Sequence, residues 1–306
     1  MPPSNMVRAI MNRHSTPTPA TRAAAAPRPV RPARPAPARP PAPAPAPQQG
    51  LVRALFVGIN YVGSPYQLAG CINDAQNMRT QVAQFFPACK DTRLLTDTTA
   101  MKPTRQNILD SLAWLVAGLR PGQNILFHFA GHGGQVRDTN GDETEGMDET
   151  IYAYDAPALR PITDDEIRAA LAAKVPAGSK CFVVLDCCHS GSAVDLRCLW
   201  KAPAQNSLSY TEDKKYAKTA GTVVFLSGCA DNDTAADTVD AAGRPCGAMT
   251  DALLTVWRQY GPAIKFKYLL WDIRALLKAR RYWQVPQLST GDVYDQSKPF
   301  DLGSAA

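Results

Sequence analysis

Short apolar runs recur along the chain from residue 51 onward, and each has the length of a β-strand. They are LVRALFVG at residues 51–58, NILFHFA at 124–130, CFVVL at 181–185 and a further run at 222–226. Largely continuous apolar runs are typical of strands buried on both faces, whereas half-exposed strands alternate apolar and polar residues. The pattern therefore predicts a buried sheet.

Helix signals lie between these runs. Thr104 is placed to cap a helix, and Thr163 with Glu166 forms a capping box that predicts a helix to about residue 174. Further helices are expected over residues 73–86, 249–260 and 268–279, and a short strand over residues 92–96. Strands that alternate with helices predict one α/β domain over residues 51–306, with a mostly parallel central sheet and helices on both faces.

The first 49 residues have a different composition, with 14 of the 26 prolines, seven arginines and no acidic residue. Such a segment cannot bury enough apolar surface to fold, so we expect a disordered pro-segment. An organellar transit peptide is a second interpretation of its arginine-rich start. Without these seven arginines the net charge of +6 becomes about −1. The folded part is therefore not basic, and nucleic acid is not expected as its ligand.

The eight cysteines contain no Cys-x-x-Cys pair, which argues against a zinc ribbon. A long chain without a secretory signal is not a disulfide scaffold, so reduced thiols in a cytoplasmic protein are expected. No apolar stretch approaches the roughly 18 residues needed to cross a bilayer. We therefore expect a soluble protein without membrane association. We also expect a monomer.

Two strand ends carry reactive side chains. The strand at residues 124–130 runs into Gly131-His132-Gly133-Gly134, and the strand at residues 181–185 runs into Asp186-Cys187-Cys188-His189-Ser190-Gly191. Functional residues of such sheets gather in loops past the carboxyl ends of the strands. Glycine in these loops lets a substrate backbone approach and leaves amides available to an oxyanion.

A thiol nucleophile needs a base, and the chain has four histidines. His14 lies in the pro-segment, and His128 lies inside a strand, where a structural role is expected. His189 directly follows Cys188, and adjacent residues at a strand end point to opposite sides. His132 follows a strand end between glycines, so it is the candidate base.

Cys187 and Cys188 both remain candidate nucleophiles from spacing. Alternation along the strand places Asp186 and Cys188 on one side and Cys187 on the other. A buried cysteine that packs as a small apolar residue is the common alternative to a reactive thiol. The spacing favours Cys188 without deciding between the two.

Several ordered blocks resemble the type I metacaspases, caspase-fold cysteine peptidases of the caspase clan. The two principal blocks are HFAGHGGQ and DCCHSGSAVDL, and they are accompanied by GINYVGSPYQLAGCINDAQNM, DTNGDETEGMDETIY, ITDDEI, LSGCADNDTAAD and GAMTDALL. The resemblance covers essentially all of the chain from Leu51. It implies a caspase-like three-layer sandwich over residues 50–306, with a large unit to about 196, a linker of about 197–220 and a small unit of about 221–306.

The same resemblance implies roles for individual residues. His132 is the base, Cys188 is the nucleophile, and the amides of Gly133 and Cys188 bind the oxyanion. Residues matching Cys71, Asp74 and Asp186 line an acidic pocket, which implies cleavage after Arg or Lys, because a buried carboxylate pairs with a basic side chain. Where the family often has Ser, this chain has Ala130, so one polar group of that pocket is absent.

Calcium and self-processing are also implied. The calcium ligands match Asp148, Asp164, Asp165 and Asp195, whose hard oxygens suit this cation. The alternative for Asp164 and Asp165 is a role in the first turn of a capped helix. Arg197, Lys201, Lys214, Lys215 and Lys218 give the linker cleavable sites, as expected for a zymogen. The family also implies a role in programmed cell death.

Two other hypotheses come from different classes. One is a caspase-fold scaffold that binds partners through its Pro-rich head and has little peptidase activity. The other is a metal-dependent hydrolase that uses His128 and His132. Four residues along a strand span about 13 Å, which is too far for two ligands of one ion.

Overall fold

The computed structural model describes residues 49–139, 141, 146–156, 160–187, 196–204, 207–228, 237–240 and 243–303. The residues from Pro47 onward form one compact unit. Three expected features lie outside the described residues, namely the pro-segment, the nucleophile Cys188 and the calcium ligand Asp195.

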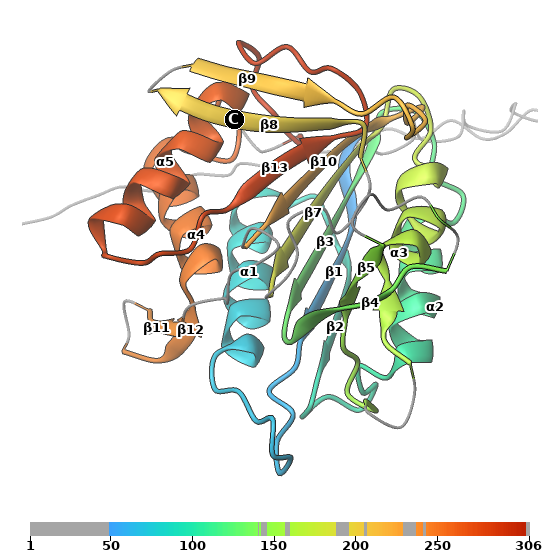
Figure 1. Ribbon diagram of the computed structural model, residues 1–306, viewed down its shortest axis with the longest axis vertical. Coiled ribbons are helices and arrows are strands. Elements are labelled where there is room, and N and C mark those ends of the chain that lie inside the picture. Colours follow the sequence, from blue (N-terminus) through green and yellow to red (C-terminus); the bar gives the residue numbers. More distant parts are fainter. Residues whose placement is uncertain are drawn as a thin grey trace, which may run out of the picture. The chain divides into compact units, whose positions relative to one another are not determined.

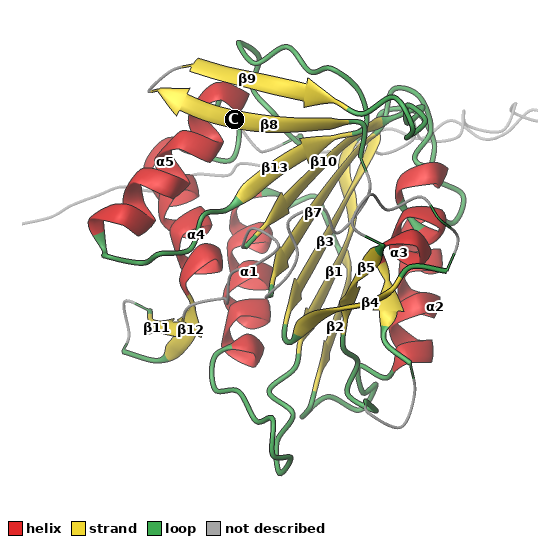
Figure 2. Ribbon diagram, viewed as in Figure 1, coloured by secondary structure: helices red, strands yellow, loops and turns green. Residues whose placement is uncertain are grey.

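An eight-stranded sheet forms the centre of this unit, with the strand order β2-β1-β3-β7-β10-β13-β8-β9 (Figures 1 and 2). The first five strands are parallel, and the last three are antiparallel to their neighbours. In chain order they are β1 (Gly50–Gly58), β2 (Asp91–Thr96), β3 (Gln123–Ala130), β7 (Lys180–Asp186), β8 (Cys198–Ala204), β9 (Ser207–Glu212), β10 (Thr222–Ser227) and β13 (Gln287–Thr290).

Helices cover both faces of the sheet, which gives three layers (Figure 1). The helices α1 (Cys71–Phe85), α4 (Ala248–Tyr260) and α5 (Phe266–Ala279) pack on one face, and α2 (Arg105–Val116) and α3 (Asp164–Ala170) pack on the other. One apolar cluster fills each interface. The predicted α/β architecture, with a mostly parallel sheet covered on both sides, is confirmed.

Alternation along the buried strands assigns each side chain to one of the two clusters. In β7, Phe182 and Val184 belong to the cluster beneath α1, α4 and α5, while Val183 and Leu185 belong to the one beneath α2 and α3. The next residue, Asp186, therefore follows Phe182 and Val184 toward α4. The same alternation determines toward which face of the sheet each side chain at the end of β7 points.

The predicted helix starts are confirmed. The Thr104 side chain accepts a hydrogen bond from the amide of Asn107, and Thr163 with Glu166 forms the capping box of α3. The helix α3 is shorter than predicted, because it ends at Ala170 and a 3-10 turn follows at Ala172–Lys174.

Several short strands were not predicted. A three-stranded sheet consists of β4 (Gly133–Arg137), β5 (Met147–Ile151) and β6 (Ile162–Thr163), and a small hairpin consists of β11 (Asp237–Val239) and β12 (Pro245–Gly247). The segment expected as a linker contains β8 and β9, which extend the central sheet. These strands are short or lie at a sheet edge, so they lack the long apolar runs that reveal β1, β3 and β7.

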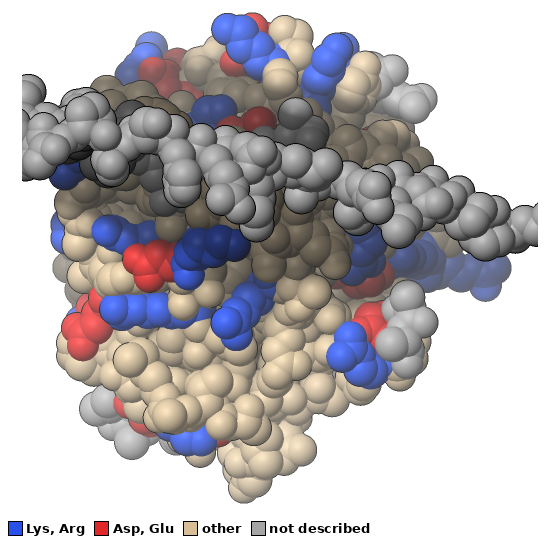
Figure 3. Space-filling view, turned by 180° about the vertical axis from the view of Figure 1, so that it is seen from behind, with Lys and Arg blue, Asp and Glu red and all other residues tan. Residues whose placement is uncertain are grey.

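The surface of the described unit carries both signs of charge. On the face shown in Figure 3, Lys and Arg side chains form separate groups, several of which adjoin Asp or Glu. Ion pairs such as Arg53–Asp91 and Arg197–Glu212 are examples of this mixing. Among the described residues, none of the helices has the length and apolar character needed to cross a membrane.

Candidate active site

The two loops singled out in the sequence start side by side. Strands β3 and β7 are parallel neighbours, and their last residues, Ala130 and Asp186, are register partners. The amide of Gly131 donates to the carbonyl oxygen of Asp186 at 3.4 Å. His132 is therefore two residues past a strand end that lies next to the start of the cysteine-containing loop.

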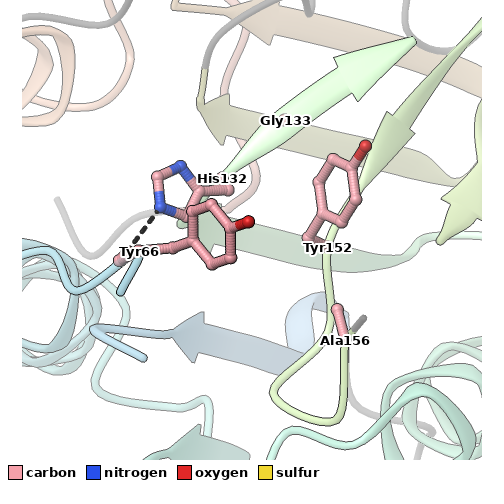
Figure 4. Close-up of a pocket in the computed structure, with 5 residues that line it drawn as sticks. All are labelled: Tyr66, His132, Gly133, Tyr152 and Ala156. Atoms are coloured by element: carbon pink, nitrogen blue, oxygen red, sulfur yellow. Dashed lines mark hydrogen bonds between the residues drawn. The ribbon is translucent and has the colours of Figure 1, made fainter. Parts of the chain in front are cut away.

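The His132 imidazole contacts a carbonyl group from a distant loop. Its Nε2 lies 2.7 Å from the carbonyl oxygen of Tyr66, as the dashed line in Figure 4 shows. A carbonyl oxygen can only accept, so Nε2 must carry the proton. In the neutral imidazole Nδ1 is then the nitrogen that can accept a proton.

Tyr61 fixes the backbone of His132. The amide of His132 donates to the Tyr61 hydroxyl oxygen at 2.9 Å, and that hydroxyl donates to the carbonyl oxygen of Tyr152 at 2.7 Å. The amide of Tyr152 donates to the carbonyl oxygen of His132 at 3.0 Å, which completes the link. The rings of Tyr61 and His132 also pack, with centroids 4.8 Å apart. Burial raises the pKa of Tyr61 well above its usual value, so the phenol remains protonated.

The glycines around His132 make room for these tyrosines. A Cβ atom on Gly131 would lie 2.9 Å from the Tyr61 hydroxyl, and one on Gly134 would lie 2.8 Å from the Tyr152 ring. Close packing therefore requires glycine at both positions, a different reason from the substrate approach expected from the sequence. Gly133 lines a cavity of about 330 Å³ together with Tyr66, His132, Tyr152 and Ala156 (Figure 4).

The structure gives Cys187 a core position. This residue is 0% exposed and packs in the cluster beneath α2 and α3, whereas Asp186 lies on the α4 side. The predicted alternation is therefore confirmed for these two residues. Cys188, which the alternation places on the side of Asp186, lies outside the described residues.

The carboxylates of Asp74 and Asp186 both lie next to the backbone of Gly247. Both carboxylate oxygens of Asp74 accept from the amide of Gly247, at 3.0 and 2.8 Å, and Oδ2 of Asp186 accepts from the amide of Thr250 at 2.8 Å. A Cβ atom on Gly247 would lie 2.3 Å from Oδ2 of Asp186 and 3.1 Å from Oδ2 of Asp74. The two carboxylates are 2% and 5% exposed. The structure thus brings together the two acids of the expected pocket.

The acids also complete the helix α4. Its N-cap residue is Gly247, which offers no side-chain cap. The carboxylates of Asp74 and Asp186 accept from the N-terminal amides instead, and the positive end of the helix dipole stabilises them as anions. A role in capping and a role in binding a cation are compatible, because a carboxylate has about four acceptor positions.

The other expected pocket residues lie close by. Cys71 begins α1 one turn before Asp74, and Gly70 approaches the backbone of Cys246 so closely that a Cβ atom would lie 2.8 Å from its Cα. Burial raises the pKa of the Cys246 thiol to about 12, and the charges of nearby acids, Asp74 first among them, add to this shift. Ala130 is fully buried opposite Asp186.

The expected calcium ligands form only part of a site. Asp148 and Asp164 are buried, and the carboxylate of Asp164 accepts from the amides of Glu149 at 2.9 Å and Asp165 at 2.8 Å. Carboxylate oxygens have the donor chemistry that calcium requires. Within the described ranges, however, no three His, Cys, Asp or Glu side chains are arranged to hold a metal ion. Asp195, the fourth expected ligand, lies outside those ranges.

His128 has the structural position predicted for it. It is fully buried, its Nε2 lies 3.2 Å from the Thr250 hydroxyl, and burial lowers its pKa to about 3. Because His128 contacts α4 and His132 contacts Tyr66, the two imidazoles do not share a site, contrary to the metal-hydrolase hypothesis.

Sequence reasoning missed Tyr61, Tyr66, Tyr152 and Gly247. The tyrosines contact His132 from other segments, and no local pattern indicates such contacts. The start of α4 did carry a signal, because a helix that begins at Gly247 without a capping side chain requires acceptors from elsewhere.

Comparison with known proteins agrees with this fold. The model of the family described as "Metacaspase, peptidase C14 domain" matches residues 52–197. The chain is 35% identical to Metacaspase-1 of Mycosarcoma maydis, over 82% of this chain and 73% of that protein, and 34% identical to Metacaspase-1 of Schizosaccharomyces pombe, over 84% and 70%. A crystal structure of a Geobacter sulfurreducens protein is similar with a TM-score of 0.57 and 25% identity, over 81% of this chain and 97% of that chain.

A mostly parallel sheet between two layers of helices, with His132 in the loop after β3 and the cysteine motif following the neighbouring strand β7 in the chain, fits the class of caspase-like cysteine peptidases. The relatives show that the chain belongs to the metacaspases. The predicted caspase-like sandwich and the predicted class of cysteine peptidase are thereby confirmed.

Proposed function

We propose that this metacaspase is an endopeptidase that cleaves after Arg or Lys, with His132 as the base and Cys188 as the nucleophile. The observation that carries the specificity is the meeting of Asp74 and Asp186 at Gly247. Both carboxylates accept hydrogen bonds from amides at the start of α4, which favour their charged form, so a cationic side chain is the complementary ligand. The pocket begins at the end of β7, two residues before Cys188 in the chain.

The proposed chemistry uses the geometry of His132. Nδ1 takes the proton of the Cys188 thiol while Nε2 stays bonded to Tyr66. The thiolate attacks the scissile carbonyl carbon, the amides of Gly133 and Cys188 stabilise the oxyanion, and the imidazolium returns its proton to the leaving amine. Water then attacks the acyl-enzyme with Nδ1 as the base, which releases the acid and restores the thiol.

An assay of matched reporter peptides tests the specificity. Peptides that differ only in Arg, Lys, Asp or Gln at the cleaved position are compared by kcat/KM. Arg and Lys peptides are expected to be cleaved at least about 100-fold faster than the Gln peptide, since a charge-assisted bond in a desolvated site contributes several kcal/mol. Equal cleavage of the Gln and Arg peptides would contradict the assignment.

Calcium stimulation is part of the same proposal. Asp148, Asp164, Asp165 and Asp195 would hold the ion, which would supply positive charge between acidic side chains of β5, α3 and the loop after β7. The burial of Asp148 and Asp164 supports this assignment, because a buried carboxylate gains from a nearby cation.

Self-processing is proposed for the segment between β9 and β10. Lys214 and Lys215 lie in an exposed turn directly after β9, where a peptidase can reach them, whereas Lys201 lies within β8. Active enzyme is therefore expected to cut a Cys188→Ala chain in this turn. A Cys188→Ala chain that stays uncut under conditions in which Arg reporters are cleaved would exclude self-processing.

A further inference from the structure

A second pocket, of about 530 Å³, lies in the turn between α5 and β13. Its lining includes three basic residues and two aromatic residues, which we name the basic–aromatic pocket: Arg274, Lys278, Arg281, Tyr282 and Trp283. Trp283 is 93% exposed, which is unusual for the largest apolar side chain. This combination has no part in the mechanism given above.

The turn holds these side chains in a fixed geometry. The amide of Tyr282 donates to the carbonyl oxygen of Leu277, and the amide of Arg281 donates to that of Lys278, both at 3.0 Å. This is a Schellman motif, and the residue at its left-handed position is Arg281, with φ of 67°. Glycine is the favoured residue there, so an arginine at this position costs stability. Retained strain of this kind is typical of functional sites.

Arg274 offers a cation that is already oriented. Its Nε donates to the carbonyl oxygen of Pro286 at 2.8 Å, and its terminal nitrogens have no hydrogen-bond or ion-pair partner in the described part of the chain. Partial burial lowers the pKa of this guanidinium, which nevertheless remains charged. A partly buried guanidinium with its two terminal nitrogens available suits a carboxylate, which it binds through two parallel hydrogen bonds.

The pocket adjoins the acidic pocket. Gln287 at the start of β13 pairs with Ser227 at the end of β10, so the preceding turn lies at the edge toward which β7 and β10 point (Figure 1). A Cβ atom on Gly228 would lie 2.9 Å from Nε2 of Gln284 and 3.1 Å from Oδ1 of Asp186. Gln284, which also lines the basic–aromatic pocket, is therefore next to the acid that is proposed to bind the cleaved residue.

We infer that the basic–aromatic pocket binds an acidic side chain, Asp or Glu, of the peptide whose Arg or Lys occupies the Asp74–Asp186 pocket. The inference rests on the proposed function, and it narrows the substrate class to peptides that carry a basic and an acidic residue a short distance apart. The carboxylate pairs with Arg274 and Arg281, and the stem of the acidic side chain packs on Trp283. Two neighbouring pockets of opposite charge would also fix the direction in which the peptide lies.

A glutamate scan tests the inference. An internally quenched peptide with a single Arg is made with Glu or Gln at each of the four positions on either side of it. At one position Glu is expected to raise kcat/KM roughly tenfold over Gln, as a charge-assisted hydrogen bond predicts. Arg281→Gly is expected to remove this preference, because it removes a cation that distinguishes Glu from Gln. Trp283→Ala is expected to raise KM for the Glu and Gln peptides alike, because the two side chains share the stem that packs on Trp283.

Arg281→Gly is the most informative variant because glycine is compatible with the backbone conformation at this position. Glycine favours a φ of 67°, so the variant is expected to melt at the same or a higher temperature than the wild type, and a loss of preference cannot be assigned to misfolding. Lys90→Gln is the matched control for net charge, since Lys90 is exposed just before β2, at the opposite edge of the sheet.

Binding separates this inference from the proposed function. Cys188→Ala protein is titrated with the preferred Glu peptide and with its Gln counterpart, and tryptophan fluorescence is followed. Tighter binding of the Glu peptide than of the Gln peptide, lost in Arg281→Gly, supports the basic–aromatic pocket. This conclusion holds even if no Arg peptide is cleaved, whereas the absence of cleavage would overturn the proposed function. Cleavage after Arg with no Glu preference at any position, or a preference that survives Arg281→Gly, would overturn the pocket.

Discussion

The carbonyl oxygen of Tyr66 accepts a hydrogen bond from Nε2 of His132 at 2.7 Å, and this contact selects the tautomer of the proposed base. Tyr66 and His132 are 66 residues apart in the chain. The loop after β1 therefore takes part in orienting a side chain carried by the loop after β3. Any change that shifts the first loop should alter catalysis without touching the substrate.

Tyr61→Phe tests this positioning. The variant deprives the amide of His132 of its acceptor and the carbonyl of Tyr152 of its donor. Loss of such a partner costs about 1–3 kcal/mol, so kcat is expected to fall by about tenfold, with KM nearly unchanged. Tyr260→Phe, which removes an exposed hydroxyl at the far end of α4, should match the wild type. Unchanged kcat in Tyr61→Phe would show that the link is dispensable.

Asp74→Asn and Asp186→Asn test the acidic pocket. Asparagine keeps an oxygen that accepts from the amides of Gly247 or Thr250, so the fold is expected to survive while the negative charge is lost. The kcat/KM for an Arg peptide should fall by roughly 30- to 1000-fold in each variant, because a buried charge pair loses one partner. Melting temperature checks the fold. Two variants that cleave the Arg peptide at the wild-type rate would rule out these acids as specificity residues.

The lowered pKa of His128 predicts how the free energy of unfolding changes with pH. Burial lowers its pKa to about 3 from an ordinary value of 6.5, so the unfolded chain takes up a proton more readily than the folded protein. The contribution of neutral His128 is complete above about pH 6.5 and is lost as the pH falls toward 3, amounting to roughly 4 kcal/mol.

His128→Gln should remove this part of the acid sensitivity. The free energy of unfolding is measured by urea titration at several pH values between 4 and 7.5. A His128→Gln slope identical to that of the wild type would contradict the assignment of the acid sensitivity to this residue.

The calcium assignment predicts direct binding in the absence of catalysis. Calorimetric titration of Cys188→Ala protein with CaCl₂ should show binding that Asp148→Asn and Asp165→Asn each weaken at least about tenfold, because each removes a charged oxygen ligand. Asp110→Asn, a change of the same kind on an exposed position of α2, should leave the affinity unaltered. Equal calcium affinities in Cys188→Ala and in the three aspartate variants would show that the ion binds at another site.

The sequence predicted most of what depends on local pattern. The strands β1, β3, β7 and β10 are largely apolar because both of their faces are buried, and the caps at Thr104 and Thr163 are local hydrogen bonds. The opposite directions of the Asp186 and Cys187 side chains followed from strand alternation. Each of these features is determined by residues close together in the chain.

The remaining features depend on contacts between distant segments. The strand β4 begins with two glycines and a glutamine, and it is stabilised by pairing with β5 rather than by its own pattern. Nothing near His132 in the chain indicates that Tyr61 and Tyr66 will hold it. The resemblance placed Asp74 and Asp186 in one pocket, but their contact with the start of α4 at Gly247 depends on distant segments that no local pattern near either acid indicates.

The most direct test of the account is a comparison of Cys188→Ala with Cys187→Ala on an Arg reporter peptide. Cys188→Ala is expected to lose all measurable turnover, because Cys187, the other cysteine of this motif, is buried in the core. Cys187→Ala is expected to keep most of the activity and to melt at a lower temperature, since it removes a buried core side chain. Wild-type turnover in Cys188→Ala, or its loss only in Cys187→Ala, would contradict the account.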